Sequence, residues 1–220
     1  MTFVRGDPER VNRKTVITDE EFQELLNKAD QIEEEFFRLR AKALLCVLRL
    51  TGKRQNEIAT LEVSDFKVQE GFLNITFTLL KKRKKTVVTR RSTKAIPLSD
   101  PLTKPILEYL DYLNKLNPKP KYFLPRAKSI GFSKKSYMLF PDKHITGRQV
   151  FNIVRSLSKK VWLHLFRETV ASDVIKSDPS IIGAFKVQRR LDLDDHRTGF
   201  RYLVRFASDI ITREESKIEA

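Results

Sequence analysis

The segment Thr51-Gly52-Lys53-Arg54-Gln55-Asn56-Glu57-Ile58-Ala59-Thr60-Leu61 joins two predicted helices. Upstream of it, apolar residues at helical spacing over 36–50 predict a long helix, and Gly52 is typical of the C-terminal cap of such a helix. Downstream, the same spacing predicts a helix from Arg54 to Leu61. Considered alone, Arg54 would be an ordinary surface arginine that follows a helix end.

Strand periodicity replaces helical spacing after Gly71. Apolar residues occupy every second position from Leu73 to Leu79, which predicts a strand. A basic turn, Lys81–Lys85, separates it from a return strand that begins at Thr86 and ends near Ile96. We expect a long antiparallel hairpin with a positively charged tip. A solvated turn that discourages edge pairing is the alternative for these lysines.

Helical spacing accounts for most of the remaining chain. Thr18 and Glu21 form a capping-box sequence before the first helix, and Thr146 is a second expected N-cap. Residues 117–144 hold four prolines and predict a long loop, or a short helix between loops. Further helices are predicted over roughly 102–113, 147–157, 162–176, 180–190 and 199–214. The predicted fold class is mainly α with a small antiparallel β-sheet, that is, α+β.

The charge of the chain is large and unevenly distributed. Its 220 residues include 43 Lys and Arg against 28 Asp and Glu, a formal net charge of +15. Residues 19–35 hold eight acids, residues 71–99 hold none, and residues 115–167 hold 13 basic residues and one acid. A solvated surface is the simpler explanation, but this segregation favours a polyanionic partner, and nucleic acid is the usual one.

Several function classes are disfavoured by composition. Cys46 is the single cysteine, flanked by apolar residues, and is expected to lie in the core rather than in a disulfide or zinc site. The three histidines are 20 and 32 positions apart, which is not a metal-ligand spacing, and no Gly-rich phosphate loop occurs. Neither a membrane span nor a secretory signal is visible. We expect a cytoplasmic, nucleoid-associated protein without cofactor or metal.

Two later segments add to the first. His164-Leu165-Phe166-Arg167-Glu168-Thr169 is followed about 35 residues later by Arg201-Tyr202-Leu203-Val204. With Thr-Gly-x-Arg-x-x-Glu-x-x-x-Leu at 51–61 and a basic hairpin between, this order resembles the catalytic domain of the tyrosine recombinase (phage integrase) family, which includes Xer, Cre and lambda integrase. The resemblance runs from about Thr18 to Phe206.

The resemblance implies a metal-independent transesterification at DNA. Tyr202 would attack a phosphodiester to form a 3′-phosphotyrosyl link, while Arg54 and Arg167 neutralise the phosphate. His164 would assist proton transfer. A hairpin lysine would protonate the departing 5′-oxygen. Lys85 is the first choice, on the resemblance of the sequence that follows it to phage integrases and Cre, and Lys82 is the second.

One position departs from the family pattern. Leu-Gly-His, or a Trp in place of His, usually stands nine residues before the nucleophile, whereas this chain has Leu191-Asp192-Leu193. His196 lies nearby and could substitute for the missing histidine if the loop is rearranged. Taken singly, His164 could equally be a core histidine, and Tyr202 could be core filling of the last helix.

The resemblance also predicts the domain organisation and partners. We expect a basic N-terminal arm over 1–15, a catalytic domain over 16–206, and a C-terminal helix over 207–220 that is exchanged between protomers. The usual N-terminal clamp domain is missing, so the chain is expected to be a catalytic fragment or a naturally short enzyme. The expected partners are double-stranded DNA with a specific recombination site and, on it, further copies in a tetramer.

The predicted function is therefore a site-specific DNA recombinase or integrase. Two alternatives remain. A type IB topoisomerase uses a similar set of residues but relaxes DNA without exchanging partners. A catalytically impaired DNA-binding regulator of the same fold would bind without cleaving, and the departure at Leu193 favours it.

Overall fold

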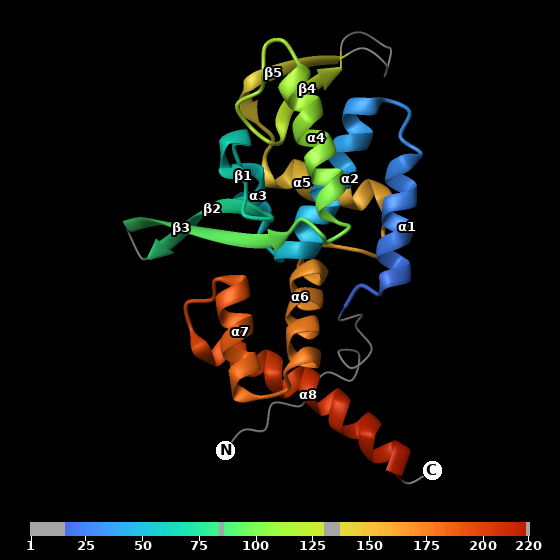
Figure 1. Cartoon of the computed structure of the whole chain (residues 1–220), viewed down its shortest axis with the longest axis vertical. Helices are drawn as coiled ribbons and strands as arrows, with labels where there is room; N and C mark the ends of the chain where they lie inside the picture. Colours follow the sequence, from blue (N-terminus) through green and yellow to red (C-terminus); the bar gives the residue numbers. More distant parts are fainter. Residues whose placement is uncertain (1–15, 84–85, 130–136, 219–220) are drawn as a thin grey trace, which may run out of the picture.

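The structure, a computed structural model, describes residues 16–83, 86–129 and 137–218. Helices predominate, and the strands form two small antiparallel sheets (Figure 1). The predicted fold class is thus confirmed. The elements, in chain order, are α1 (Asp19–Asp30), α2 (Glu35–Thr51), α3 (Gln55–Ala59), the 3-10 turn η2 (Val63–Asp65), β1 (Phe66–Gln69), β2 (Phe72–Arg83), β3 (Thr86–Pro97), α4 (Thr103–Lys115), β4 (Pro125–Ser129), β5 (Tyr137–His144), α5 (Gly147–Leu157), α6 (Leu163–Ser177), α7 (Ile181–Leu191) and α8 (His196–Ile218).

The main hydrophobic core forms around α2. Residues from Ala43 to Leu48 of this helix have no exposed surface, because α1, α4 and α6 pack around it. The helix before it begins where the sequence predicts: the Thr18 hydroxyl accepts from the backbone N–H of Glu21, and the Glu21 carboxylate accepts from that of Thr18. These reciprocal bonds satisfy backbone donors that a helix start leaves unpaired.

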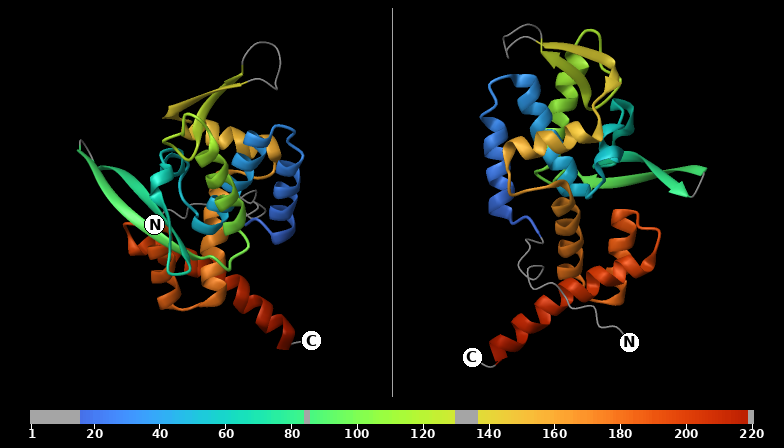
Figure 2. Two further views of the ribbon diagram at one scale, coloured as in Figure 1. Left: turned by 45° about the horizontal axis from the view of Figure 1, so that its top comes forward. Right: turned by 180° about the vertical axis from the view of Figure 1, so that it is seen from behind.

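The predicted hairpin is confirmed as β2 and β3, with β1 added on the other side of β2. The alternating residues Leu73, Ile75, Phe77 and Leu79 are buried. Beyond them, the hairpin projects from the body of the molecule (Figures 1 and 2). Its base is therefore anchored in the core, while its far end extends away from it.

The prediction of a long loop or a short helix over 117–144 is wrong. This region contains β4 and β5, which pair antiparallel with a register shift next to Pro125. Its strands alternate poorly in hydrophobicity, and prolines interrupt them. β4 and β5 pair with each other, and an isolated bridge between Glu62 and Tyr122 lies just before β4.

Helices α6, α7 and α8 form a second, smaller unit. The C-terminal part of α6 packs with α7 and α8 around a separate cluster of buried apolar residues, whereas its N-terminal part belongs to the main core. α6 thus connects the two parts, and the C-terminal half of α8 runs away from both (Figure 2). Members of the second cluster are Val170, Ala171, Ile175, Val187, Leu191, Tyr202 and Phe206.

The two parts meet where α2 and α7 end. Gly52 caps α2 in the left-handed conformation at φ 60°, and Asp192 caps α7 in the same conformation at φ 49°. A Cβ at Gly52 would lie 2.7 Å from Cδ2 of Leu191, so glycine permits both the turn and the close approach. Among the described residues, no helix is long and apolar enough to cross a bilayer.

Candidate active site

Arg54 lies at the N-terminal cap of α3. This helix is shorter than predicted and begins at Gln55, so that Arg54 precedes it in extended conformation. The buried carboxylate of Glu57 accepts from the Arg54 backbone N–H at 2.9 Å and from Nη1 at 3.0 Å. About half of the Arg54 side chain (51%) remains exposed. Glu57 therefore anchors this arginine and leaves part of its guanidinium facing solvent.

Arg167 is buried on α6, between the ends of α2 and α7. Its Nη1 donates to the carbonyl of Gly52 at 2.9 Å, and its Nη2 donates to the carbonyl of Leu191 at 2.6 Å. Burial, and next the positive charge of Arg54, lower the pKa of Arg167. Since an arginine stays charged in proteins, these two guanidinium groups together form a local positive centre.

Tyr202 lies on α8 with 8% of its surface exposed, and its ring stacks on that of Phe206. Its hydroxyl lies near the side chain of Arg167, and each group shifts the pKa of the other. Burial and the charge of Glu168 raise the pKa of Tyr202, and the charge of Arg167 opposes that rise. The structure thus brings Arg54, Arg167 and Tyr202 together from α3, α6 and α8.

His164 lies one turn before Arg167 on α6, and 62% of its side chain is exposed. The alternative of a buried core histidine is therefore wrong. Its Nε2 lies 2.7 Å from Oε1 of Glu168, whose other oxygen accepts from Nη1 of Arg205 at 2.6 Å. Glu168 is buried and was not singled out from the sequence. It connects the histidine to α8, the helix of Tyr202.

The hairpin lysines are placed only in part. Lys85 lies outside the described residues, and so does the side chain of Lys82, whose backbone pairs with Val87 in the hairpin. Lys94, further along β3, is buried, and its Nζ donates to the Arg189 carbonyl at 2.7 Å and lies 3.1 Å from the Asp192 carboxylate.

A short loop, 192–195, joins the end of α7 to the start of α8. His196 begins α8, is 64% exposed, and has contacts with Asp195 and Phe200 in the described part of the chain. The neighbouring Asp192 instead turns inward and contacts Lys53, Lys94 and Ser92. Sequence reasoning missed this group. The one sign of it in the sequence is the position of Lys94, which falls in the two-residue repeat of the hairpin residues that are buried.

This arrangement is suited to a phosphodiester. Two guanidinium groups can neutralise non-bridging oxygens, and a tyrosine hydroxyl beside them is a nucleophile of the kind that forms covalent intermediates. Across the described ranges, no group of three or more His, Cys, Asp or Glu side chains could hold a metal ion.

Solved structures with the same fold are recombinases. XerH bound to difH substrate in a pre-cleavage complex has a TM-score of 0.54 and 21% identity, covering 86% of this chain and 50% of that one. XerA recombinase has a TM-score of 0.59 and 19% identity, covering 92% and 64%. XerH with palindromic difH, in a post-cleavage complex, has a TM-score of 0.60 and 20% identity, covering 94% and 54%. The chain thus spans about half to two thirds of these relatives.

A comparison with curated proteins gave no match. The model of the phage integrase family, however, matches residues 15–203. This range includes the first two sequence motifs and the third up to Leu203, and with them Arg54, Arg167 and Tyr202. By sequence and by fold, the chain belongs to the phage integrase family, that of the tyrosine recombinases.

Proposed function

We propose that this protein is a site-specific DNA recombinase that cleaves and rejoins DNA through Tyr202. The proximity of the Tyr202 hydroxyl to the guanidinium of Arg167, which in turn lies near Arg54, is the observation that carries the proposal. A tyrosine hydroxyl and two guanidinium groups are the parts that transesterification at a phosphodiester requires.

In the proposed reaction, the Tyr202 oxygen attacks phosphorus, and the bond from phosphorus to the 5′-oxygen breaks. The products are a 3′-phosphotyrosyl link and a free 5′-hydroxyl. Attack by a 5′-hydroxyl on that link reverses the step and restores the tyrosine. Since one phosphodiester is exchanged for another, the bond energy is retained and no cofactor is consumed.

Charge develops on the non-bridging oxygens in the transition state. Arg54 and Arg167 would bind these oxygens, and the part of Arg54 that faces solvent is available to do so. His164 would take the proton from Tyr202 or bind the phosphate, because its exposed ring lies on the same helix face as Arg167. Lys85, or Lys82 as second choice, would donate a proton to the leaving 5′-oxygen.

Tyr202 is not poised for attack in the free protein. Its side chain is nearly buried, and its raised pKa keeps the hydroxyl protonated at neutral pH. A DNA phosphate that enters beside Arg54 and Arg167 would compete with the Tyr202 hydroxyl for the nearby guanidinium of Arg167. We infer that DNA binding releases Tyr202 for reaction.

Duplex DNA is the proposed substrate for two independent reasons. The chain carries a net charge of +15, with basic residues concentrated in the hairpin and over 115–167. Similar folds occur in XerH bound to the difH substrate, before and after cleavage. We expect strongly salt-dependent binding and dependence on a specific site.

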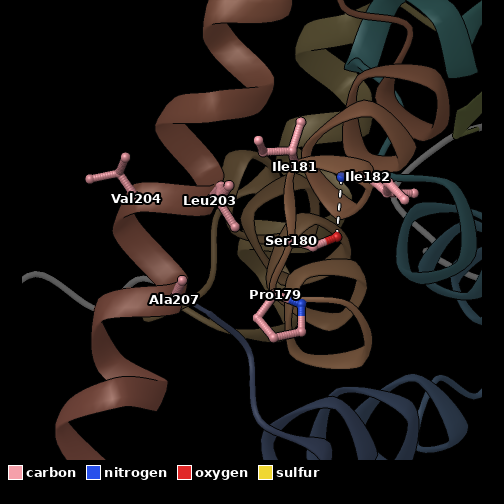
Figure 3. Close-up of a pocket in the computed structure, with 7 residues that line it drawn as sticks. All are labelled: Pro179, Ser180, Ile181, Ile182, Leu203, Val204 and Ala207. Atoms are coloured by element: carbon pink, nitrogen blue, oxygen red, sulfur yellow. Dashed lines mark hydrogen bonds between the residues drawn. The ribbon is translucent and has the colours of Figure 1, made fainter.

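We further propose that copies of this chain assemble on DNA through segment 207–220. A pocket of about 670 Å³ lies between the start of α7 and the middle of α8 (Figure 3). Ile181 and Ile182 at its rim are about 60% exposed, which is unusual for large apolar side chains. The last turns of α8 point away from the body of their own chain (Figure 2). The pocket is lined by Pro179, Ser180, Ile181, Ile182, Leu203, Val204 and Ala207.

The covalent intermediate provides the test of function. A pool of nicked suicide duplexes, randomised around the nick, is incubated with the chain, and denaturant-resistant protein–DNA adducts are isolated and sequenced. We expect adducts with a common sequence, and none with Tyr202→Phe. Adducts that persist in Tyr202→Phe would identify another nucleophile.

Two outcomes would favour the alternatives. DNA binding without any adduct would favour a catalytically impaired regulator, and adducts without a preferred sequence together with plasmid relaxation would favour a topoisomerase. The assembly is tested separately by light scattering with the enriched duplex. Deletion of 208–220 should leave the adduct intact but abolish assembly beyond one protomer per half-site.

A further inference from the structure

The carboxylate of Asp192 collects contacts from two distant parts of the chain. Lys53, in the segment before α3, forms an ion pair with it. From β3, Lys94 lies 3.1 Å away and the Ser92 hydroxyl donates to it at 2.8 Å. The side chains of Asp192, Lys53 and Lys94 are all at least 92% buried. This group, Lys53–Ser92–Lys94–Asp192, is called the Asp192 cluster below.

The strand positions show that the cluster is built into the fold. Ser92 and Lys94 pair with Phe77 and Ile75 across the hairpin, and directly opposed residues share a face of the sheet. Two polar side chains therefore occupy the face that buries the apolar residues of β2. Placing a lysine there is unfavourable unless a partner compensates its charge, and Asp192 is that partner.

The ends of two helices face each other at the same place. Both α2 and α7 present their C-terminal carbonyls, which carry partial negative charge. Cations from elsewhere bind these carbonyls: Arg167 bridges Gly52 and Leu191, and Lys94 binds Arg189. Arg190 likewise donates to the Leu50 carbonyl at 2.7 Å. The junction thus gathers several positive groups, and Asp192 supplies a negative side chain among them.

We propose that Asp192 is a positioning residue of the active site. Asp192 holds the end of α7 against the segment that carries Arg54. Because a loop joins α7 to α8, the same contacts also restrain α8, the helix that carries Tyr202. This inference rests on the proposed function of Tyr202 and Arg54. α6 is the covalent connection between the two parts (Figure 2), so a second tie, from Asp192 to Lys53 and Lys94, restrains the angle between them.

The position of Asp192 in the chain supports this role. It lies in the left-handed conformation, which Asn and Gly also adopt readily. Asp192→Asn and Asp192→Gly therefore keep the backbone turn and remove the negative charge. Asp195→Asn is a matched control, because that carboxylate lies in the same loop, is 55% exposed and accepts a local backbone bond from Arg197.

The test compares binding with cleavage in the full chain. Using the nicked duplex enriched from the random pool, we expect both Asp192 variants to lose at least tenfold in the single-turnover rate of adduct formation. Their affinity for DNA should change less than threefold, since the basic surfaces are intact. Asp195→Asn should match the wild type in both. An adduct rate within twofold of wild type for both Asp192 variants would overturn the proposal.

A second variant separates positioning from simple charge balance. Lys53→Met, Lys94→Met and Asp192→Asn together remove every charge of the cluster, so that no ammonium group is left without a partner. We expect this triple variant to recover thermal stability relative to Asp192→Asn, but not the adduct rate. If the adduct rate also recovers, Asp192 serves as a counter-charge alone, and the positioning role is wrong.

Hydrogen exchange supplies a readout that does not depend on catalysis. In the free protein, Asp192→Asn should raise exchange in 181–207 by at least tenfold and leave the β2–β3 base within twofold of wild type. If Tyr202 proves not to be the nucleophile, this result still shows whether Asp192 restrains α7 and α8. Unchanged exchange in 181–207 would contradict the restraint itself.

Discussion

Nε2 of His164 lies 2.7 Å from Oε1 of Glu168, one turn further along α6. Because Glu168 is buried, its carboxylate needs charged or donating partners, and the Nε2 edge of the His164 ring is one of them. The second oxygen of Glu168 accepts from Arg205, three residues after Tyr202. A single buried carboxylate thus orients the proposed proton-transfer residue and ties it to the helix of the proposed nucleophile.

Glu168→Gln should therefore slow cleavage without preventing DNA binding. The amide oxygen of the variant can still accept from one partner, His164 or Arg205, but its NH2 group cannot accept from the other. Loss of one charge-assisted bond corresponds to about 1.5–3 kcal/mol, or roughly a 10- to 100-fold lower single-turnover rate of adduct formation. Asp173→Asn on the same helix, where the carboxylate pairs with Arg49, is the control and should stay within about twofold. A normal rate in Glu168→Gln would show that this bridge is dispensable.

The two arginines should differ in what their replacement does to folding. Arg54→Lys and Arg167→Lys should each reduce adduct formation by roughly 100-fold or more, about 3 kcal/mol, as for loss of an oxyanion-hole donor. Arg167→Lys should also reduce the free energy of unfolding by about 1–3 kcal/mol, because lysine cannot bind the Gly52 and Leu191 carbonyls as a fork. Arg54→Lys should unfold like the wild type in urea titrations. Equal stability of the two variants would contradict a structural role for Arg167.

Gly52→Ala should destabilise more than Gly71→Ala. Both glycines have positive φ, of 60° and 79°, so alanine at either carries a left-handed penalty of about 1–2 kcal/mol. At Gly71 no atom lies within 4 Å of the added Cβ, whereas at Gly52 it meets Leu191 at 2.7 Å and Val170 at 3.3 Å. We expect at least about 1 kcal/mol of additional loss at Gly52 from this overpacking, measured by denaturant unfolding. If both variants lose the same free energy of unfolding, the contact of the new Cβ with Leu191 costs nothing. The two parts of the molecule would then separate easily.

The Asp192 cluster makes stability depend on pH. Burial and the charge of Lys94 lower the pKa of Lys53 to about 7, and burial with the nearby arginines lowers that of Lys94 to about 8. An unfolded lysine keeps its proton to about pH 10, so between these values the unfolded chain binds more protons, and the free energy of unfolding rises with pH. We expect a rise of roughly 1 kcal/mol per pH unit between about pH 7 and 8.5.

Two variants check this assignment. In urea titrations over that pH range, Lys53→Met should reduce the rise of the free energy of unfolding with pH. Lys94→Met should reduce it at the upper end of the range. Cys46 opposes this rise: burial raises the pKa of its thiol to about 12, so an unfolded thiol, which ionises near about pH 8.5, makes the rise less steep above that pH. A slope that is the same in all three proteins would exclude the two lysines as its cause.

The general acid can be identified by changing the leaving group. Lys85→Ala should strongly reduce adduct formation on ordinary nicked DNA, because the 5′-oxygen leaves without a proton. A 5′-bridging phosphorothiolate has a sulfur leaving group that needs no acid, and it should restore the rate of Lys85→Ala but not that of Arg54→Lys. Rescue of Lys82→Ala in place of Lys85→Ala would transfer the role to the second candidate.

Sequence reasoning was most successful where neighbouring residues determine structure. The capping box at Thr18 and the alternation from Leu73 to Leu79 depend on partners a few positions away or on one repeating period, and both are confirmed. The strands β4 and β5 were missed, because their sequences do not alternate regularly between apolar and polar residues and Pro141 lies within β5, although the two strands pair with each other.

For the candidate site, the amino-acid sequence alone determined the family and the identity of the motif residues, including Arg54, Arg167 and Tyr202. It showed Leu193 in place of the family's histidine, with Asp192 beside it at the glycine position of the pattern. Only the tertiary structure reveals a buried carboxylate that contacts Lys53 and Lys94, 139 and 98 positions away. The reason is physical: which charges share a buried carboxylate depends on how two helix ends and a strand pack together, and no local pattern in the chain specifies that arrangement.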